Sequence, residues 1–124
     1  MPLNATPTLY GIPNCGSVKK ARAWLEARGV VYRFVDFKKT PPTDSQLTDW
    51  AAKRGWEVLL NRRGTTFRGL AEGEKAELDA ARAKALMLKY PSLIKRPVLE
   101  HGTGDVTVGF DAATYEALFP AQST

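Results

Sequence analysis

The stretch LYGIPNCGSVKKARAWL, Leu9–Leu25, predicts a β-strand that passes through a short turn into an α-helix. Its first residues favour a strand, and Pro13 breaks that strand. Apolar residues then recur at helical spacing over Ser17–Arg28, and those on one face are Val18, Ala21 and Leu25. The only cysteine of the chain, Cys15, lies in the turn between the two elements.

The residues after this helix complete a β-α-β unit. Val30–Phe37 is rich in β-branched and aromatic residues and predicts a second strand. Because one helix connects the two strands, we expect them to pair in parallel. Thr43 and Gln46 have the spacing of a capping box, which predicts a further helix over Asp44–Arg54.

The middle of the chain predicts a helical insertion. Trp56–Leu60 indicates a short helical turn, and Asn61–Leu70 (NRRGTTFRGL) indicates a loop. Glu72–Lys89 is the longest segment with helical spacing, and Pro91 ends it. The predicted apolar face of this helix consists of Leu78, Ala81, Ala85 and Leu88.

The last third predicts two strands, Pro97–Glu100 and Val106–Phe110, and a final helix capped by Asp111. The glycines of the connecting HGTGD permit a tight reversal, in which we expect His101 to be solvated. The whole order predicts an α/β protein with a thioredoxin-like fold: a four-stranded mixed sheet with a helical insertion. At this length we expect residues 1–124 to form a single domain.

Composition excludes several classes of protein. One cysteine and one histidine rule out a disulfide framework and argue against a metal site. No apolar run approaches the ~20 residues that span a bilayer, and the N-terminus lacks signal-peptide features, so we expect no membrane contact and a cytoplasmic protein. The net charge of +5 suits an anionic ligand. Nucleic acid is not expected, because no basic helix or interleaved aromatic motif is present.

Cys15 has two interpretations. A single free cysteine is ordinarily a small buried hydrophobic residue. Cys15, however, is predicted to lie where a helix begins, and there free backbone N–H groups and the helix dipole stabilise an anion. Lys19 and Lys20 would add positive potential. Such a setting lowers a thiol pKa from ~8.5 to ~3.5–7.5, which makes a thiolate that attacks disulfides or an electrophilic oxyanion.

Three separated segments of the chain resemble the ArsC-like family. This family holds glutaredoxin-coupled arsenate reductases, the Spx transcriptional regulators and YffB-like thiol reductases. The matching segments are Tyr10–Leu25, Leu59–Arg68 and Ile94–Leu99, and Gly109-Phe110 suits the YffB-like branch. The resemblance extends over Thr8–Phe119 and implies the thioredoxin-like fold with its helical insertion.

The resemblance also implies roles for individual residues. Cys15 matches the catalytic cysteine, and Arg63 and Arg96 match two arginines that hold the oxyanion, although a shift of one residue would exchange Arg63 for Arg62. Pro97 matches a proline that is cis in thioredoxin-like folds. The residues assigned to binding glutathione or substrate are Asn14, Lys19, Arg63, Arg96 and Pro97.

Two departures from the family narrow the predicted chemistry. Gly109 stands where arsenate reductases have a third arginine, and Val18 stands where Spx regulators have a second cysteine. We therefore expect a glutathione-dependent thiol reductase that uses Cys15 with an external resolving thiol. It would hold no bound cofactor, take glutathione as co-substrate, and act on glutathionylated or disulfide partners or with glutaredoxin. The alternative is an Spx-like regulator that binds RNA polymerase without an internal redox switch.

Overall fold

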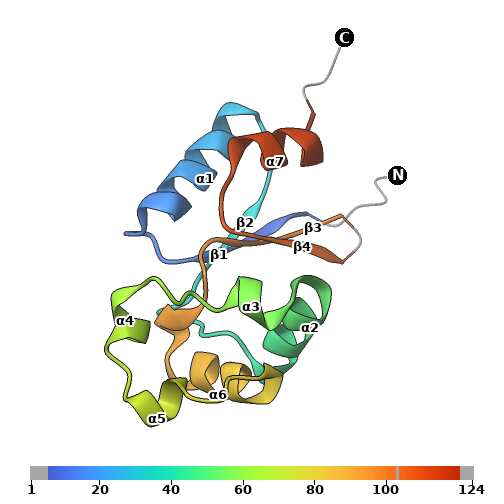
Figure 1. Cartoon of the computed structure of the whole chain (residues 1–124). Helices are drawn as coiled ribbons and strands as arrows, with labels where there is room; N and C mark the ends of the chain where they lie inside the picture. Colours follow the sequence, from blue (N-terminus) through green and yellow to red (C-terminus); the bar gives the residue numbers. More distant parts are fainter. Residues whose placement is uncertain (1–5, 103, 121–124) are drawn as a thin grey trace. The chain divides into compact units, whose positions relative to one another are not determined.

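The computed structural model describes residues 6–102 and 104–120. These residues form two compact units, which are coloured by sequence in Figure 1. The sheet unit contains the described residues up to Asp36 together with those from Arg96 onward. The helical unit is Phe37–Lys95, so the insertion predicted from the sequence is a compact body of its own.

The sheet unit is built on a four-stranded mixed sheet with the order β2-β1-β3-β4. Its strands are β1 (Thr8–Gly11), β2 (Arg33–Asp36), β3 (Val98–His101) and β4 (Asp105–Val108). β1 pairs in parallel with β2 and antiparallel with β3, and β3 pairs antiparallel with β4. The predicted thioredoxin-like topology is confirmed, including the parallel first pair.

Two helices pack on this sheet, α1 (Gly16–Ala27) and α7 (Ala112–Leu118) (Figure 1). The buried residues that join them to the strands are Leu9, Ala21, Leu25, Leu99 and Tyr115. Trp24 meets the ring of Tyr115 edge-on, with 5.6 Å between the ring centroids. As predicted, Asp111 caps α7, since its carboxylate accepts a hydrogen bond from the Thr114 amide at 3.1 Å. Apolar burial between these two helices and β1 and β3 forms the core of the unit.

The second strand is shorter than the sequence predicted. β2 begins at Arg33, whereas the prediction began at Val30. The Val30 amide donates to the carbonyl of Leu25 at 2.9 Å and so completes the end of α1 rather than entering the sheet. Val31, which follows, is 79% exposed. The first residue of this β-prone run, Val30, therefore takes part in the end of α1, and the strand starts three residues later at Arg33.

The helical unit consists of short helices joined by tight loops. They are α2 (Asp44–Arg54), α3 (Trp56–Leu59), α4 (Thr65–Arg68), α5 (Glu72–Lys75), α6 (Ala80–Lys89) and the 3-10 helix η1 (Pro91–Leu93). The capping box of α2 is confirmed: the Gln46 amide donates to Thr43 Oγ1 at 3.1 Å, and the Thr43 amide donates to Gln46 Oε1 at 2.9 Å. Within residues 6–102 and 104–120, none of the helices is both long and apolar enough to span a bilayer.

Two predictions for the insertion are wrong in their boundaries. Glu72–Lys89 is not one helix, because the Asp79 carboxylate accepts the Arg82 amide at 2.9 Å and starts α6 there. Glu77 takes a positive φ of 53°, which no α-helix accommodates. The predicted loop Asn61–Leu70 contains the single turn α4. Side-chain capping thus overrides a continuous helical pattern.

The predicted apolar face of the last insertion helix is also wrong. The buried residues of α6 are Ala83, Leu86 and Met87. Of the predicted face, Ala81 and Ala85 are exposed, and Leu88 is 38% exposed. The predicted face was counted from Leu78, which lies before the first residue of α6. In the helix that begins after Asp79, the buried face is instead the neighbouring one, formed by Ala83, Leu86 and Met87.

His101 is buried rather than solvated, which corrects the prediction from the sequence. It is the last residue of β3, opposite Asp105 of β4, and only 8% of it is exposed. Its Nε2 lies 2.8 Å from Thr107 Oγ1. The strand runs one residue past the predicted end at Glu100, so the reversal starts at Gly102. Thr103, in the predicted HGTGD turn, lies outside the described residues.

The Tyr115 hydroxyl generates a stability prediction. Its oxygen is buried and has no hydrogen-bond partner among the described residues, and burial raises the pKa of this phenol. Since an unpaired buried hydroxyl costs free energy, we expect Tyr115→Phe to leave the free energy of unfolding unchanged or to raise it by about 1 kcal/mol. Urea unfolding monitored by fluorescence measures this value.

The matched control is Tyr115→Ala, which removes the ring as well. It should lower the free energy of unfolding by about 3–5 kcal/mol, as for other buried aromatic residues. A loss of more than about 1 kcal/mol for Tyr115→Phe would show that the hydroxyl is paired in solution.

Candidate active site at the start of α1

Cys15 occupies the N-cap of α1, directly after the turn that follows β1. Its φ of −83° and ψ of 129° are extended, so the residue lies half in and half out of the helix. The Cys15 amide donates to the Ile12 carbonyl at 3.1 Å, and the Cys15 carbonyl accepts the Lys19 amide at 2.9 Å. Both backbone groups are therefore fixed, and the half-buried thiol is held beside the Ser17 and Val18 amides of the first helical turn.

Gly11 allows the close approach of β1 and α1 that sets this geometry. A Cβ built on Gly11 would lie 2.6 Å from Cγ2 of Val18, which is fully buried. Only glycine therefore fits between the end of β1 and the first turn of α1. Gly11 was not predicted from the sequence to be a positioning residue. A glycine in the last position of a strand, just before the reactive turn, was the available signal.

The environment of Cys15 favours the thiolate. Partial burial raises the thiol pKa, but the Val18 amide and the Arg96 guanidinium act in the opposite direction and the Ser17 amide assists them. The net pKa of Cys15 is lowered from that of an ordinary cysteine. The thiol makes no capping hydrogen bond of ordinary distance and angle. Stabilisation therefore comes from several amide dipoles and one cation that face the sulfur, rather than from a single cap bond.

Arg96 and Pro97 precede β3, which lies next to β1 in the sheet. The Arg96–Pro97 peptide bond is cis, an isomer that the sequence left open. The Pro97 carbonyl accepts the amide of Gly109 at 2.8 Å, and Pro97 itself is buried. Arg96 is half-buried and its guanidinium reaches the Cys15 thiol, so the fold brings together two of the predicted site residues.

Two other predicted site residues of the sheet unit are on its surface. Asn14 and Lys19 are both exposed. The cation that lowers the pKa of Cys15 is Arg96, which lies far away in the sequence. The predicted assignment of Asn14 and Lys19 to substrate binding stays a prediction.

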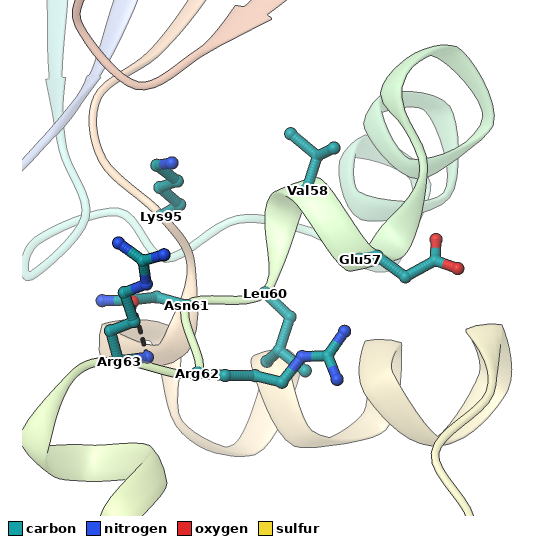
Figure 2. A pocket seen from close by; sticks show the side chains of 7 residues that line it. All are labelled: Glu57, Val58, Leu60, Asn61, Arg62, Arg63 and Lys95. Atoms are coloured by element: carbon teal, nitrogen blue, oxygen red, sulfur yellow. Dashed lines mark hydrogen bonds between the residues drawn. The ribbon is translucent and has the colours of Figure 1, made fainter.

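Arg63 belongs to the helical unit, where it lines an open pocket of about 490 Å³ (Figure 2). The lining residues are Glu57, Val58, Leu60, Asn61, Arg62, Arg63 and Lys95. The Arg63 amide donates to Asn61 Oδ1 at 3.1 Å, which fixes the loop. Arg62 lies over the ring of Trp56 at 5.5 Å, and Figure 2 shows it extending away from Arg63. The two neighbouring arginines therefore have different surroundings.

Gly109 has a backbone conformation that suits glycine. Its φ is 82°, and the residue is buried beside Pro97, to which its amide donates. An arginine at this position would need a left-handed backbone, which costs a non-glycine residue free energy. The backbone conformation at position 109 therefore disfavours an arginine, in agreement with the glycine that the sequence has there.

The described residues offer no candidate metal centre. Among residues 6–102 and 104–120, no three of the histidine, cysteine, aspartate and glutamate side chains are grouped so that they could bind one ion. The chemical groups that do converge are a thiol, backbone amides and a guanidinium. These are the components of a nucleophilic cysteine site.

Comparison with known proteins gives matches over most of the chain. The model of the ArsC family matches residues 10–118. A solved structure named YFFB protein is 50% identical, with a TM-score of 0.89 over 92% of this chain and 99% of that one. An uncharacterised protein of Haemophilus influenzae is 38% identical over 112 residues, which are 90% of this chain and 97% of the relative.

Two further relatives carry names that describe different activities. An arsenate reductase of Rhizobium meliloti is 32% identical over 94 residues, 74% of this chain and 66% of the relative. The global transcriptional regulator Spx of Streptococcus mutans is 29% identical over 115 residues, 91% of this chain and 82% of the relative. Both kinds of protein named in the sequence resemblance are therefore found among the matches.

The lowered pKa of Cys15 leads to a prediction for its reactivity. We expect the rate of alkylation by iodoacetamide to rise with pH around a midpoint below the ~8.5 of an ordinary cysteine. Arg96→Gln removes the positive charge next to the thiolate, so its midpoint should lie higher than that of the wild type. Lys19→Gln is the matched control and should shift the midpoint less. An equal shift in the two variants would contradict the assignment of the effect to Arg96.

The contact between Gly11 and Val18 leads to a second prediction. Gly11→Ala forces a methyl group against a buried side chain, so it should lower the free energy of unfolding by about 1–3 kcal/mol. By displacing the start of α1 it should also change the alkylation midpoint of Cys15. Denaturant unfolding and alkylation measure the two effects.

Gly16→Ala is the control for this substitution, because a Cβ on Gly16 would have no atom within 4 Å. It lies one residue beyond Cys15 and should not lower the free energy of unfolding. Adding Val18→Ala to Gly11→Ala should restore the alkylation midpoint. Equal destabilisation by the two single glycine substitutions would refute the close-approach explanation.

Proposed function

Because the chain belongs to the ArsC family, we propose that it is a glutathione-dependent thiol reductase in which Cys15 is the nucleophile. The observation that carries this proposal is the thiol of Cys15, held beside helix amides and the Arg96 guanidinium with a lowered pKa. A thiolate available at neutral pH is the reactive form in thiol–disulfide exchange. The named relatives include an arsenate reductase, which is an oxidoreductase of this family.

The reaction follows from having one thiol in the chain. The Cys15 thiolate attacks one sulfur of glutathione disulfide or of a glutathionylated protein, the S–S bond breaks, and the other sulfur leaves as a thiolate. Cys15 is then joined in a mixed disulfide. A second thiolate from outside, from glutathione or from a glutaredoxin, attacks that bond and releases Cys15. With a glutathionylated protein as substrate, the cycle releases the protein thiol, and one external thiol is oxidised to a disulfide with the glutathione that Cys15 carried.

Arsenate reduction is less well supported by the residues of the site. Gly109 stands where the resemblance places a third arginine in arsenate reductases, and its φ of 82° disfavours an arginine there. Removal of one cationic donor from an oxyanion site costs roughly 3–4 kcal/mol of transition-state stabilisation. Two arginines remain, Arg63 and Arg96. A peptide thiol, whose reaction forms no multiply charged tetrahedral oxyanion, depends less on the third.

Glutathione itself suits the positive groups of this chain. It carries two carboxylates, and the residues proposed to bind it are Asn14, Lys19, Arg63, Arg96 and Pro97. Guanidinium groups bind carboxylates through paired, charge-assisted hydrogen bonds. A glutathione pool that keeps thiols reduced is a property of the cytosol, so we place the protein there.

The test is formation of a mixed disulfide between Cys15 and glutathione. Incubation with glutathione disulfide at neutral pH should add one glutathione per chain, detected as intact mass and mapped to Cys15 by peptide mass spectrometry. Cys15→Ser should show no addition, and Arg96→Gln should react more slowly because its thiolate is less stabilised. A reduced thiol should reverse the addition. Absence of the adduct in the wild type would overturn the proposed function.

The second candidate is an Spx-like regulator that binds RNA polymerase. It is favoured by the match to the Streptococcus mutans Spx regulator over 91% of this chain. The chain has no internal disulfide switch, because the position of the second cysteine holds Val18, which is buried against Gly11. Retention of polymerase subunits in a pull-down, by Cys15→Ser as well as by the wild type, would support this candidate. Loss of glutathionylation with retained polymerase would replace the reductase proposal by it.

A further inference from the structure

The pocket of the helical unit carries an excess of positive charge. Three of its lining side chains are cationic (Arg62, Arg63 and Lys95), and one, Glu57, is anionic. Figure 2 shows Arg63 and Lys95 extending on one side of the pocket and Glu57 on the other. Within the described part of the chain, the side chains of Arg63 and Lys95 make no ion pair with a carboxylate. Their charges are therefore available to an anionic ligand.

The size and walls of the pocket favour an organic acid over a bare oxyanion. Its volume of about 490 Å³ lies within the roughly 300–1,000 Å³ typical of small-molecule sites. A tetrahedral oxyanion would leave most of that space to water. The wall opposite Arg63 and Lys95 includes Val58, an apolar side chain of α3 that is 47% exposed. Two cations that face an exposed valine across the pocket (Figure 2) suit a ligand that has both a carboxylate and an apolar segment.

The loop that presents Arg63 is held in a defined conformation. Asn61 Oδ1 accepts the Arg63 amide at 3.1 Å, and a Cβ on Gly64 would lie 2.9 Å from Asn61 Nδ2. The backbone at both ends of the pocket is also fixed, since the Lys95 amide donates to the Leu59 carbonyl at 2.8 Å and the Asn61 amide donates to the Leu93 carbonyl at 2.7 Å. The two cationic side chains therefore project from a paired, ordered backbone.

We infer that this pocket binds a carboxylate of glutathione, with Lys95 as a specificity-determining residue beside Arg63. The inference rests on the proposed function for the choice of glutathione, but it needs no reaction at Cys15. Lys95 and Arg96 are neighbours in the sequence and belong to different units. Arg96 faces the Cys15 thiol within the sheet unit, and Lys95 lines the pocket within the helical unit.

The experiment uses S-methylglutathione, which keeps both carboxylates and cannot form a disulfide. In an NMR titration of the full chain, this compound should shift the amide signals of residues 57–63 and 95, which include all the lining residues of the pocket. The diethyl ester of the same compound, which lacks both negative charges, should move these signals far less. Lys95→Gln should weaken binding by about tenfold, the usual effect of losing one charge-assisted hydrogen bond. Lys39→Gln removes an exposed lysine of the same unit outside the pocket and should bind as the wild type does.

The outcomes separate this inference from the proposed function. Equal affinities of wild type and Lys95→Gln, or shifts that map only outside residues 57–63 and 95, would overturn the inference while glutathionylation of Cys15 stands. Equal binding of the ester would also overturn it, because the carboxylate would then contribute nothing. Competition by inorganic phosphate at a concentration as low as that of S-methylglutathione would show a bare-anion site instead. Binding to the pocket without glutathionylation would support the inference and overturn the thiol chemistry alone.

Discussion

The close packing of Val18 on Gly11 is the constraint on which the candidate active site depends. The glycine ends β1, the valine lies in the first turn of α1, and no other side chain fits between them. This contact fixes the distance between strand and helix. It therefore places Cys15 where the helix amides face its sulfur, and the lowered thiol pKa follows from that placement. Val18 has a packing role at the position that would hold a second thiol in an Spx regulator.

The sheet then supplies the positive charge. Because β3 pairs antiparallel with β1, the residues that precede β3 lie beside those that follow β1. Arg96 immediately precedes the cis proline at this point, and its guanidinium stabilises the thiolate. A local helix terminus and a remote cation thus act on one sulfur. Neither is unusual alone, but together they outweigh the effect of burial on the pKa of Cys15.

The basic residues of the chain divide between the two units. Arg96 belongs to the sheet unit, while Arg63 and Lys95 line a pocket of the helical unit. In the family resemblance, Arg63 and Arg96 were grouped as one oxyanion site. Within the sheet unit Arg96 faces the Cys15 thiol, and within the helical unit Arg63 lines the pocket together with Lys95. That difference is what makes Lys95, a residue without a role in the sequence resemblance, a candidate for recognising substrate.

The order of the four strands, the capped start of α2 and the position of Cys15 at a helix start could be predicted from the sequence, because each depends on residues within a few positions of one another. Prediction from the sequence failed where side chains and backbone from distant segments compete. The cap at Asp79 starts a new helix within a continuous helical pattern, and the packing of α6 determines which of its faces is buried. His101 is buried because it pairs with β4. Tertiary packing also brings Arg96 to Cys15. It leaves room at position 11 for glycine but not for a residue with a Cβ atom. Short-range spacing records local hydrogen bonding, whereas contacts across the sheet depend on how whole elements pack.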